Sequence, residues 1–555
     1  MSVLRTIPAR EALDVEFKSD QARLPDAELV EAVVCLANTA GGVIYLGVED
    51  DGRITGLHRS RTSPDGLPAL IANRTSPPVD VQVVELSAEG HRVVRISVPR
   101  AMQIVSTSDG TMKRRRLDLH GRPECVPLLP SDITSRLSSL GVLDRSAESV
   151  PGAVMTDLDP VERARLRQFI ERFHGDRELL DLSDDELDGA LGLVTPGSAS
   201  RVPTLTGLLL IGKEESLRHL VPTHEIAFQV LEGEEVRFNE FRRGPLLRLV
   251  DWLDAQFAAR NPEAEIQVGL FRVGVPRVDA RAYREAVANA VVHRDYARLG
   301  AIHVRLDAEE LSVSSPGGFV EGVSVDNVLT TAPRPRNPRL ADAFKRLGLV
   351  ERTGRGVDLI FRTTIRFGRP APSYARSTTE SVSLHIPAAG ADLAFLRMVL
   401  DAERDRGGSL PVDSLIALSC IRSERRVSAE RVAQAIQKDR AAAGKTLEAL
   451  VEAGLVEPSG NTRARTYLLS AKVYAVEGQR AGYTRQAGFD RIRQMQMVLE
   501  FARQHGVVKR ADVIELCRLT GDQASKLLRD LAAKGRLRKD RERRWATYSI
   551  PKGEA

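Results

Sequence analysis

The spacing of apolar and polar residues changes several times along the 555-residue chain, and each change marks an expected element. In the first part, DAELVEAVVCLANTA (26–40) has the apolar period of an amphipathic helix. Strand patterns occur in VEFK, GVIYLGV, VDVQVVEL and HRVVRISV, and the DDG turn after GVIYLGV predicts a hairpin. We expect a mixed α/β domain over residues 1–135, followed by a Ser/Gly/Pro-bearing linker over 136–158.

Two further segments with α/β patterns follow the linker. Residues 159–264 contain helix patterns in PVERARLRQFIERF and GPLLRLVDWLDAQF, and strand patterns in LTGLLLIG and HEIAFQVLEG. Residues 265–388 contain the helix pattern RAYREAVANAVVHRDY, the strands AIHVRL and ELSVSS, a Pro/Arg-rich loop, a second helix and the strand SVSLHI. The pattern leaves open whether 159–264 is a separate connector or the outer part of the unit that follows.

From about residue 389 the chain is helical and charged, and it contains an internal repeat with an offset of 81 residues. GKTLEALVEAGLV (444–456) aligns with SKLLRDLAAKGRL (525–537). Each copy has the pattern of an amphipathic helix closed by Gly, then a polar turn and a strand pair, as in the second half of a winged helix-turn-helix. The sequence predicts winged helices over 389–472 and 486–551.

One helix in the third segment carries a polar stripe. Glu285, Asn289 and His293 are spaced by four residues, so they share one helix face. A solvated face is the ordinary explanation of such a stripe. Here, however, glycine turns follow it, in SSPGGF (314–319) and RTGRGVDLI (352–360), with the basic loop TTAPRPRNPRL between them. A glycine turn at a helix N-terminus exposes backbone N–H groups that bind phosphate.

This ordered set resembles the GHKL ATPase fold of gyrase, Hsp90, histidine kinases and MutL, a Bergerat-type α/β sandwich. It is similar in particular to predicted ATP-binding transcriptional regulators, where E-x-x-x-N-A-x-x-H-R-D-Y, P-G-G and G-x-G recur in this order. The resemblance implies ATP and Mg²⁺ as cofactors. In it Glu285 orients or deprotonates the attacking water, Asn289 ligates Mg²⁺, and the PRPRNPRL loop is the nucleotide lid. The implied cofactor-binding residues are Asn289, Ser315, Gly317, Gly318, Arg336, Gly354 and Gly356.

The chain departs from this pattern at one position. Standard members have an Asp before the first glycine turn, where its carboxylate reads the adenine amino group. Ser314 and Ser315 occupy that place here, and a hydroxyl accepts such a bond more weakly than a carboxylate. His293 receives no catalytic role from the pattern; we expect it to cap the helix or contact the lid.

The N-terminal segment resembles a Schlafen AlbA-type domain, and the resemblance implies a DNA-binding module. The resemblance is carried by EALDVEFKSD and by LANTAGGVIYLGVEDDGRITGL. We expect Arg114, Arg115 and Arg116 to contact phosphates, which position a nucleic acid without reading its sequence. Some relatives are metal-dependent RNA nucleases built on three carboxylates, so the alternative is a metal site formed by Glu11, Glu16 and Glu49.

Charge is unevenly distributed along the chain. The net charge is +5, yet residues 501–555 hold 14 Lys and Arg against 7 Asp and Glu, which favours a nucleic-acid partner. We expect the second winged helix to make the stronger DNA contact; the first could instead dock a protein. The candidate nucleic-acid residues there are Lys526, Arg529, Arg541, Arg543 and Arg544.

Cysteine content and hydropathy bear on the compartment. The four cysteines lie far apart, form no metal-ligand pair and suggest no disulfide scaffold. No apolar run approaches the ~20 residues of a membrane span, and the N-terminus lacks an apolar signal core. These features predict a cytoplasmic protein with no membrane partner.

Together the patterns predict a multidomain chain of α/β and helical domains. The main hypothesis is a transcriptional regulator that binds DNA, or RNA, in response to Mg·ATP, with a homodimer as a further expectation. The alternative is a Schlafen-type nuclease regulated by ATP, and a third is a degenerate ATPase domain used as a scaffold.

Overall fold

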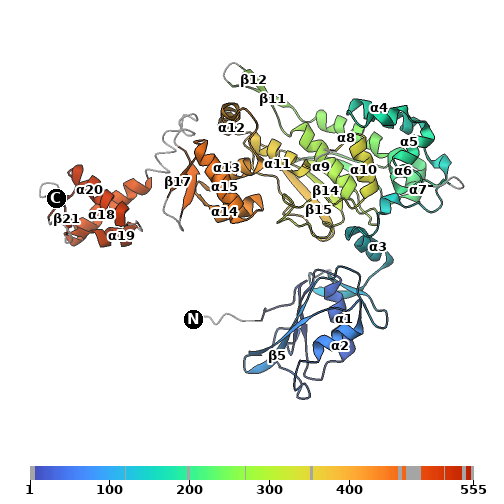
Figure 1. The fold of residues 1–555 in the computed structure, drawn as a ribbon, viewed down its shortest axis with the longest axis horizontal. Helices are drawn as coiled ribbons and strands as arrows, with labels where there is room; N and C mark the ends of the chain where they lie inside the picture. The colour runs from blue at the N-terminus through green and yellow to red at the C-terminus, as the bar shows by residue number, and fades with distance from the viewer. Residues whose placement is uncertain are drawn as a thin grey trace. The chain divides into compact units, whose positions relative to one another are not determined.

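The computed structural model describes residues 7–118, 120–196, 201–268, 271–350, 354–459, 465–470, 489–517, 519, 521–540 and 546–551. Figure 1 labels the helices and strands of the chain, which divides into two compact units. The first contains Met1–Ala264, Pro276–Ile360 and Pro372–Ala389, and the second contains Glu265–Val275, Phe361–Ala371 and Gly390–Ala555. Among the helices of these described ranges, none combines the length and the apolar character needed to cross a membrane.

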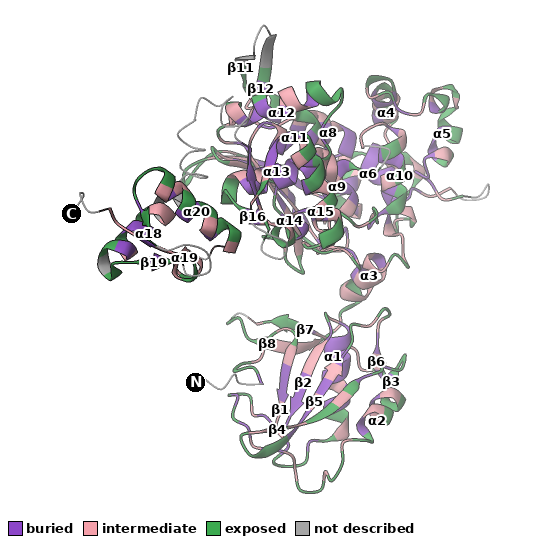
Figure 2. Ribbon diagram, turned by 60° about the vertical axis from the view of Figure 1, so that its left-hand side comes forward, coloured by how far each residue is buried: buried purple, intermediate pink, exposed green. Residues whose placement is uncertain are grey.

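The N-terminal region contains a four-stranded sheet in the order β1-β2-β5-β4. Strand β1 pairs parallel to β2, and the other neighbours are antiparallel. Helix α1 packs on this sheet, and both are buried over much of their length (Figure 2). Leu29, Val33 and Leu36 of the helix belong to one buried cluster with Ile44 and Ile96. The elements are β1 (Val15–Lys18), α1 (Asp26–Ala37), β2 (Gly42–Leu46), α2 (Leu67–Arg74), β3 (Thr75–Ser76), β4 (Gln82–Ala88), β5 (His91–Val98) and β6 (Ser106–Thr107).

Two expectations for this region were wrong. The hairpin expected after β2 is reduced to an isolated bridge between Val48 and Ile54, because the ladder partners of β2 are β1 and β5. The distant cysteines suggested no disulfide scaffold, yet Cys35 of α1 is bonded to Cys125 of β8. Folding brings the two together although 90 residues separate them. The hairpin of β7 (Lys113–Leu117) and β8 (Pro123–Pro127) is thereby tied to α1.

The segment expected to be a linker over 136–158 contains regular structure. Helix α3 (Pro130–Ser139) enters it, and 3-10 turns follow at Arg145–Ala147 and Met155–Asp157. LTGLLLIG, expected as a strand, is helix α6, with the Thr204 hydroxyl accepting from the Gly207 N–H at its start. A short, wholly buried apolar run fits either element by its pattern, and here the N-cap and the packing on every side decide for the helix. The helices of this part are α4 (Pro160–Arg172), α5 (Asp184–Ala190), α6 (Leu205–Ile211), α7 (Glu214–Leu220) and α8 (Leu246–Ala258), with a 3-10 turn at Arg177–Asp181.

A five-stranded sheet, in the order β10-β9-β13-β14-β15, forms the centre of the next part. Strands β9 and β13 are parallel, and the other neighbours are antiparallel. Because β9 and β10 lie within 159–264, that segment supplies the outer strands of this sheet rather than an independent connector. The elements are β9 (Ile226–Glu232), β10 (Glu235–Arg242), α9 (Ala280–His293), β13 (Ile302–Leu306), β14 (Glu310–Pro316), α10 (Pro338–Arg346), α11 (Gly356–Arg366) and β15 (Ser381–Pro387). A separate two-stranded sheet contains β11 (Glu263–Val268) and β12 (Phe271–Pro276).

The second unit contains the two copies of the repeat, and both have the same order of elements. In each, a helix, a two-residue strand and two more helices precede a strand pair, and the three strands form one sheet, β16-β18-β17 or β19-β21-β20. After α12 (Leu393–Arg406), the first copy contains α13 (Val412–Glu424), β16 (Val427–Ser428), α14 (Ala429–Ile436), α15 (Arg440–Glu452), β17 (Val456–Ser459) and β18 (Thr466–Leu469). The second contains α18 (Phe489–His505), β19 (Val508–Lys509), α19 (Arg510–Cys517), α20 (Gly521–Ala533), β20 (Arg538–Lys539) and β21 (Thr547–Ser549).

Candidate functional site

A cavity of about 640 Å³ lies in the first unit, against α9 and the strands β14 and β15. Its remaining walls come from the segment after β14, from α10 and from the start of α11. This volume is in the range of small-molecule sites, about 300–1,000 Å³. The residues expected from sequence that line it are Glu285, Asn289, His293, Ser315, Gly317, Gly318, Gly354 and Gly356.

Helix α9 positions the polar stripe. The Asp279 carboxylate caps its first turn by accepting from the N–H groups of Arg281 and Ala282, while most of its other side chains are buried. Glu285 is 7% exposed, and its Oε1 accepts a hydrogen bond of 3.2 Å from Asn289 Nδ2. The stripe therefore faces the cavity rather than open solvent. This bond leaves Asn289 Oδ1 as the oxygen that this side chain can offer to a metal ion.

Two glycines allow the backbone to approach these side chains closely. A Cβ on Gly356, at the start of α11, would overlap Oε1 of Glu285. Gly317 has φ of +98°, and a Cβ there would lie 2.6 Å from the Cβ of Asp295. Each position requires glycine for space, and at Gly317 for conformation as well. The N-terminus of α11 thus lies close against the face of α9 that carries Glu285.

Ser315 and His293 line the cavity between these glycines. The Ser315 hydroxyl donates to the carbonyl of Ala290 in α9 over 2.7 Å. Because its proton is used in this bond, the hydroxyl can act toward a ligand only as an acceptor. Burial lowers the pKa of His293 to about 4, and the nearby Arg336 cation adds to the effect. His293 is therefore a neutral side chain at neutral pH, in a wall of the cavity.

Arg336, expected as a nucleotide ligand, does not line the cavity. It is 3% exposed, and its guanidinium donates to the backbone carbonyls of His293, Ser135 and Gly318 at 2.8–3.3 Å. The Arg336 side chain points into the protein, where its N–H groups are hydrogen-bonded to these carbonyls. Arg334, two residues earlier, and Lys345 of α10 line the cavity instead. The sequence marks Arg334 as part of a basic loop, but nothing in it indicates that Lys345 faces this cavity.

One part of the cavity is apolar and was not expected from sequence. Val313, Leu384, Phe319 and Tyr374 line it, and the last two rings pack edge to face with centroids 5.9 Å apart. Burial, and secondarily the charge of Glu285, raises the pKa of Tyr374, so its phenol stays protonated. An apolar surface of this kind can cover the flat face of a nucleobase.

The donor set fits Mg²⁺ with a nucleoside triphosphate. Asn289 offers an amide oxygen, Glu285 a carboxylate beside it, and Arg334 and Lys345 two cations. Hard divalent cations take oxygen ligands, and phosphates take cations and helix N-termini. A site made of these groups and an apolar surface can hold a charged tail at one place and a ring at another.

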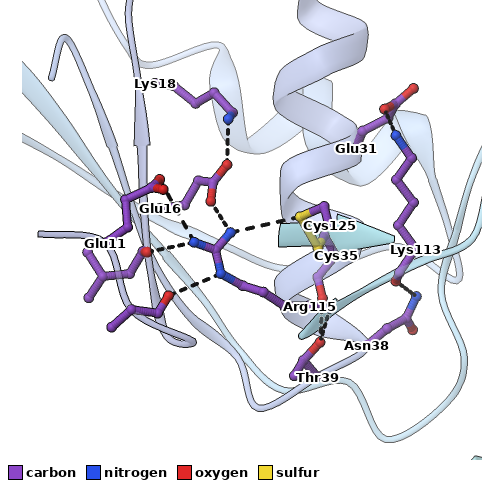
Figure 3. Close-up of a disulfide and its surroundings, with 12 residues drawn as sticks. Glu11, Glu16, Lys18, Glu31, Cys35, Asn38, Thr39, Lys113, Arg115 and Cys125 are labelled. Atoms are coloured by element: carbon purple, nitrogen blue, oxygen red, sulfur yellow. Dashed lines mark hydrogen bonds and ion pairs between the residues drawn. A yellow bond between two sulfur atoms is a disulfide. The ribbon is translucent and has the colours of Figure 1, made fainter. Parts of the chain in front are cut away.

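The N-terminal carboxylates form a different arrangement (Figure 3). Arg115, expected to contact phosphate, is 3% exposed; its guanidinium pairs with Glu16 and lies 3.8 Å from Glu11. It also donates to the carbonyls of Ala12 and Val15 at 3.1 and 3.0 Å. Arg115 is therefore a buried structural side chain, because its donors are directed into the domain and not toward solvent.

The other two arginines of this strand differ in exposure. The side chain of Arg114 is 23% exposed and lies 3.2 Å from Asp132, whereas that of Arg116 is 53% exposed and pairs with Glu124 at 2.7 Å. Of the three, Arg116 has the most accessible guanidinium.

The carboxylate trio expected for a nuclease does not assemble. Glu16 is paired with Lys18 as well as Arg115, and Glu49 Oε1 accepts from Ser19, Gln21 and Thr55. The Thr55 hydroxyl, followed by that of Ser19, holds the pKa of Glu49 below its usual value. No group of three metal-ligating side chains occurs among the residues for which the structure gives positions. Cations already neutralise Glu11 and Glu16, and Glu49 is held by its own partners.

The second copy of the repeat exposes polar side chains along one face of α20. Gln523, Lys526 and Arg529, spaced by three, are exposed, while Leu527 and Leu528 are buried in the core of this copy. In α15 of the first copy, Lys445 and Glu448 occupy the positions of Lys526 and Arg529 and are also exposed. Arg541, Arg543 and Arg544 lie outside the described residues.

Comparison with known protein families gives matches to three parts of the chain. Residues 11–119 match the family described as "Schlafen, AlbA_2". Residues 300–386 match "Putative ATP-dependent DNA helicase recG C-terminal", and residues 138–227 match a domain of unknown function. The second match includes Ser315, Gly317, Gly318 and Gly356 but begins after α9, so Glu285 and Asn289 lie outside it.

Comparison with whole proteins adds a similarity of fold. A solved structure, that of the DIP2311 protein from Corynebacterium diphtheriae, is 24% identical, with a TM-score of 0.50. The match covers 84% of this chain and 94% of that one. No curated protein matches the chain. The chain thus contains a Schlafen AlbA_2 domain and an ATPase-like domain, and these two domains together indicate a nucleic-acid-binding, ATP-dependent protein.

Proposed function

We propose that this protein is a transcriptional regulator whose binding to DNA is controlled by Mg·ATP in the cavity beside α9. The observation that carries the proposal is the convergence of Glu285, Asn289 and Gly356 on one cavity of about 640 Å³. Two cationic side chains, Arg334 and Lys345, line the same cavity. This combination suits a triphosphate with its metal ion better than it suits a neutral ligand.

Each side chain has a part in this scheme. Asn289 offers Oδ1 to Mg²⁺, which when bound neutralises phosphate charge. Glu285, 3.2 Å from Asn289 Nδ2, is placed to orient a water molecule and accept its proton. Arg334 and Lys345 attract the phosphates, and Tyr374 and Phe319 cover the base. Ser315 can accept one hydrogen bond from the base through its lone pairs.

The repeated copies are proposed to be winged helix-turn-helix domains, and α20 is proposed as the DNA-recognition helix. Its exposed Gln523, Lys526 and Arg529 form a polar and basic face, and a helix of this kind enters the major groove. In α15 the equivalent of Arg529 is Glu448, which phosphate repels. We therefore assign the stronger DNA contact to the second copy.

Equilibrium dialysis with Mg·ATP tests the nucleotide site. Asn289→Ala should weaken ATP binding by at least about tenfold, because a charge-assisted contact contributes about 1.5–3 kcal/mol. Glu285→Gln should keep ATP binding within about threefold and lower any hydrolysis by about 100-fold or more. The matched control is Asn239→Ala, an exposed amide on β10. Equal ATP affinity in the wild type, Asn289→Ala and the control would contradict the site.

DNA affinity, measured with and without Mg·ATP over a salt series, tests the regulation. Lys526→Ala with Arg529→Ala should weaken binding by about tenfold and reduce the salt slope by about two phosphate contacts. Lys445→Ala, the matched change in the first copy, should alter affinity by less than about twofold. If Mg·ATP leaves the affinity of the wild type unchanged, the protein is not an ATP-controlled regulator.

A further inference from the structure

The segment that follows α9, from Arg294 to Tyr296, has contacts that nucleotide binding does not require. Arg294 is fully buried, and it donates to the carbonyls of Thr223, Arg298 and Gly300. These bonds fix the loop between α9 and β13, which explains Arg294 as a structural side chain. Asp295 next to it has another set of partners.

Asp295 lies beneath the first glycine turn of the cavity. It is 2% exposed, its N–H donates to the carbonyl of Pro316 over 2.9 Å, and its Cβ fills the space that Gly317 leaves empty. Its carboxylate accepts from the hydroxyl of Ser135, which belongs to α3. One buried carboxylate therefore connects the glycine turn to a helix outside the cavity.

Arg336 makes the same connection from the other side. Its guanidinium donates to Gly318 of the glycine turn, to the end of α9 at His293, and to the Ser135 carbonyl of α3, and it lies 3.8 Å from Asp295. The Arg336 carbonyl accepts from the Ser138 hydroxyl over 3.2 Å. Arg336 follows the cavity-lining Arg334 by two residues, so the basic loop and α3 are linked through it.

Helix α3 has further contacts with the cavity segment. The N–H of Glu321 donates to the Ser139 carbonyl over 3.0 Å, and its carboxylate accepts from Arg136 over 2.8 Å. Val320, the neighbour of Glu321, lines the cavity. At its other end, α3 begins at Pro130, three residues after β8 ends at Pro127. It is therefore the covalent continuation of the hairpin that carries Arg114–Arg116.

We propose that Ser135, Ser138, Asp295 and Arg336 form an α3 junction that transmits the nucleotide state of the cavity to the N-terminal Schlafen-type domain. This inference rests on the proposed function, since it needs a nucleotide in the cavity. Asp295 packs against Gly317, and Arg336 donates to the Gly318 carbonyl. A ligand that moves Gly317, Gly318 or Arg334 on binding therefore changes the hydrogen bonds of Asp295 and Arg336. Buried polar networks favour two discrete arrangements, because a half-satisfied buried group is costly. Ser135 and Ser138 are positioning residues and contact no nucleotide.

The test uses the full chain and the double variant Ser135→Ala/Ser138→Ala. It removes two hydroxyls from α3 and leaves every cavity-lining side chain in place. The matched control is Ser139→Ala on the same helix, whose hydroxyl bonds within α3, to the Arg136 carbonyl. Hydrogen exchange of the α3 amides is measured with and without a non-hydrolysable Mg·ATP analogue, together with the affinity for the analogue.

In the wild type and the control, the analogue should change α3 exchange by about fivefold or more, the lower range of allosteric coupling. In the double variant this change should fall below about twofold, with analogue affinity kept within about threefold. An unchanged α3 response in the double variant would overturn the junction and leave the nucleotide site standing. Failure of the wild type to bind the analogue would overturn the proposed function itself. Binding without any α3 response in the wild type would overturn the junction alone.

If the double variant is poorly folded, Arg136→Ala is the second variant, because it breaks the bonds from α3 to Glu321 and to the Ala101 carbonyl and leaves Ser135, Ser138, Asp295 and Arg336 in place. It should reduce the α3 response by about twofold or more. The junction would also be overturned if folded Arg136→Ala kept the full change in α3 exchange and one of the single variants, Ser135→Ala or Ser138→Ala, kept it as well.

Discussion

Two places in the molecule hold the carboxylates that the sequence marks as candidate catalytic groups, and they differ in which groups lie beside those carboxylates. At the cavity, Glu285 lies beside an amide, that of Asn289, and a glycine, Gly356. In the N-terminal domain, Glu11 and Glu16 lie beside the buried guanidinium of Arg115. The first arrangement borders a cavity of about 640 Å³, and in the second a buried cation lies between the carboxylates. A carboxylate pattern in a sequence therefore does not define a metal site until the opposing cation is known.

The comparison also explains why we retain the hypothesis of a nucleotide site at Glu285 and Asn289 and do not retain that of a nuclease site at Glu11, Glu16 and Glu49. Glu285 and Asn289 come from one helix, so their proximity follows from a spacing of four. Glu11, Glu16 and Glu49 come from three places, and their proximity depends on how the chain folds. In the folded chain, Glu49 accepts hydrogen bonds from Ser19, Gln21 and Thr55. The guanidinium of Arg115 lies beside Glu11 and Glu16.

The largest expected effect is that of Arg115→Met. Removal of the guanidinium takes the buried cation from beside Glu11 and Glu16 and leaves only Lys18 paired with Glu16. Breaking a buried pair in this way costs about 3–5 kcal/mol. Hydrogen exchange of the β1 and β2 amides in the full chain measures the free energy of opening of this domain. Arg116→Met is the control, because its ion pair is exposed and contributes about 0–1 kcal/mol. Equal effects of the two changes would show that Arg115 is not the counter-ion of this core.

The next effect concerns pH at the cavity. The pKa of His293 falls from 6.5 to about 4 on folding, so the unfolded chain binds a proton that the folded chain excludes. Stability of this part should therefore fall as the pH drops from about 6.5 to about 4, by at most about 3 kcal/mol. His293→Gln should flatten this slope when opening of the α9 amides is followed against pH. Burial raises the pKa of Glu11, so the slope contributed by the N-terminal site has the opposite sign. An unchanged α9 slope in His293→Gln would rule out this titration.

A smaller effect is expected for Gly356→Ala. The added methyl group overlaps the Glu285 carboxylate, and such overpacking costs about 1–3 kcal/mol, or about 5–150-fold in ATP affinity. Calorimetric titration measures the affinity. Adding Glu285→Ala should restore part of the loss by removing the overlap. Gly444→Ala in α15, where the methyl group meets nothing within 4 Å, should leave ATP binding unchanged. A Gly356→Ala protein with wild-type affinity would mean that the two residues are not in contact.

The smallest effect is the response of the N-terminal domain to Mn²⁺. In the wild type, millimolar Mn²⁺ should change the opening of β1 and β2 by less than about twofold, because Arg115 already neutralises the carboxylates. In Arg115→Met the same ion should stabilise the domain by about 1 kcal/mol, by replacing the lost cation. Stabilisation of the wild type by Mn²⁺ and its loss in Glu16→Gln would reinstate the nuclease hypothesis.

The sequence predicted the parts of the fold whose patterns are local. The strands around VEFK and HRVVRISV and the helices over DAELVEAVVCLA and ARAYREAVANAVVH occur as expected. The order of the two repeated copies also follows the pattern, because both have matching apolar positions. The glycine turns likewise line the cavity, as expected. Gly317 and Gly356 occupy positions with no room for a side chain.

Other features were decided only by tertiary structure. LTGLLLIG is a helix because it is buried on every side, and Cys35 meets Cys125 because the β7–β8 hairpin lies beside α1. Arg334 and Arg336 differ by two positions in one basic loop, yet one faces the cavity and the other is buried under α3. Periodicity and turn preference depend on neighbours along the chain, so a sequence contains them. Whether a charged side chain meets solvent, a ligand or a counter-ion depends on which distant segment packs against it, and that is fixed only when the chain has folded.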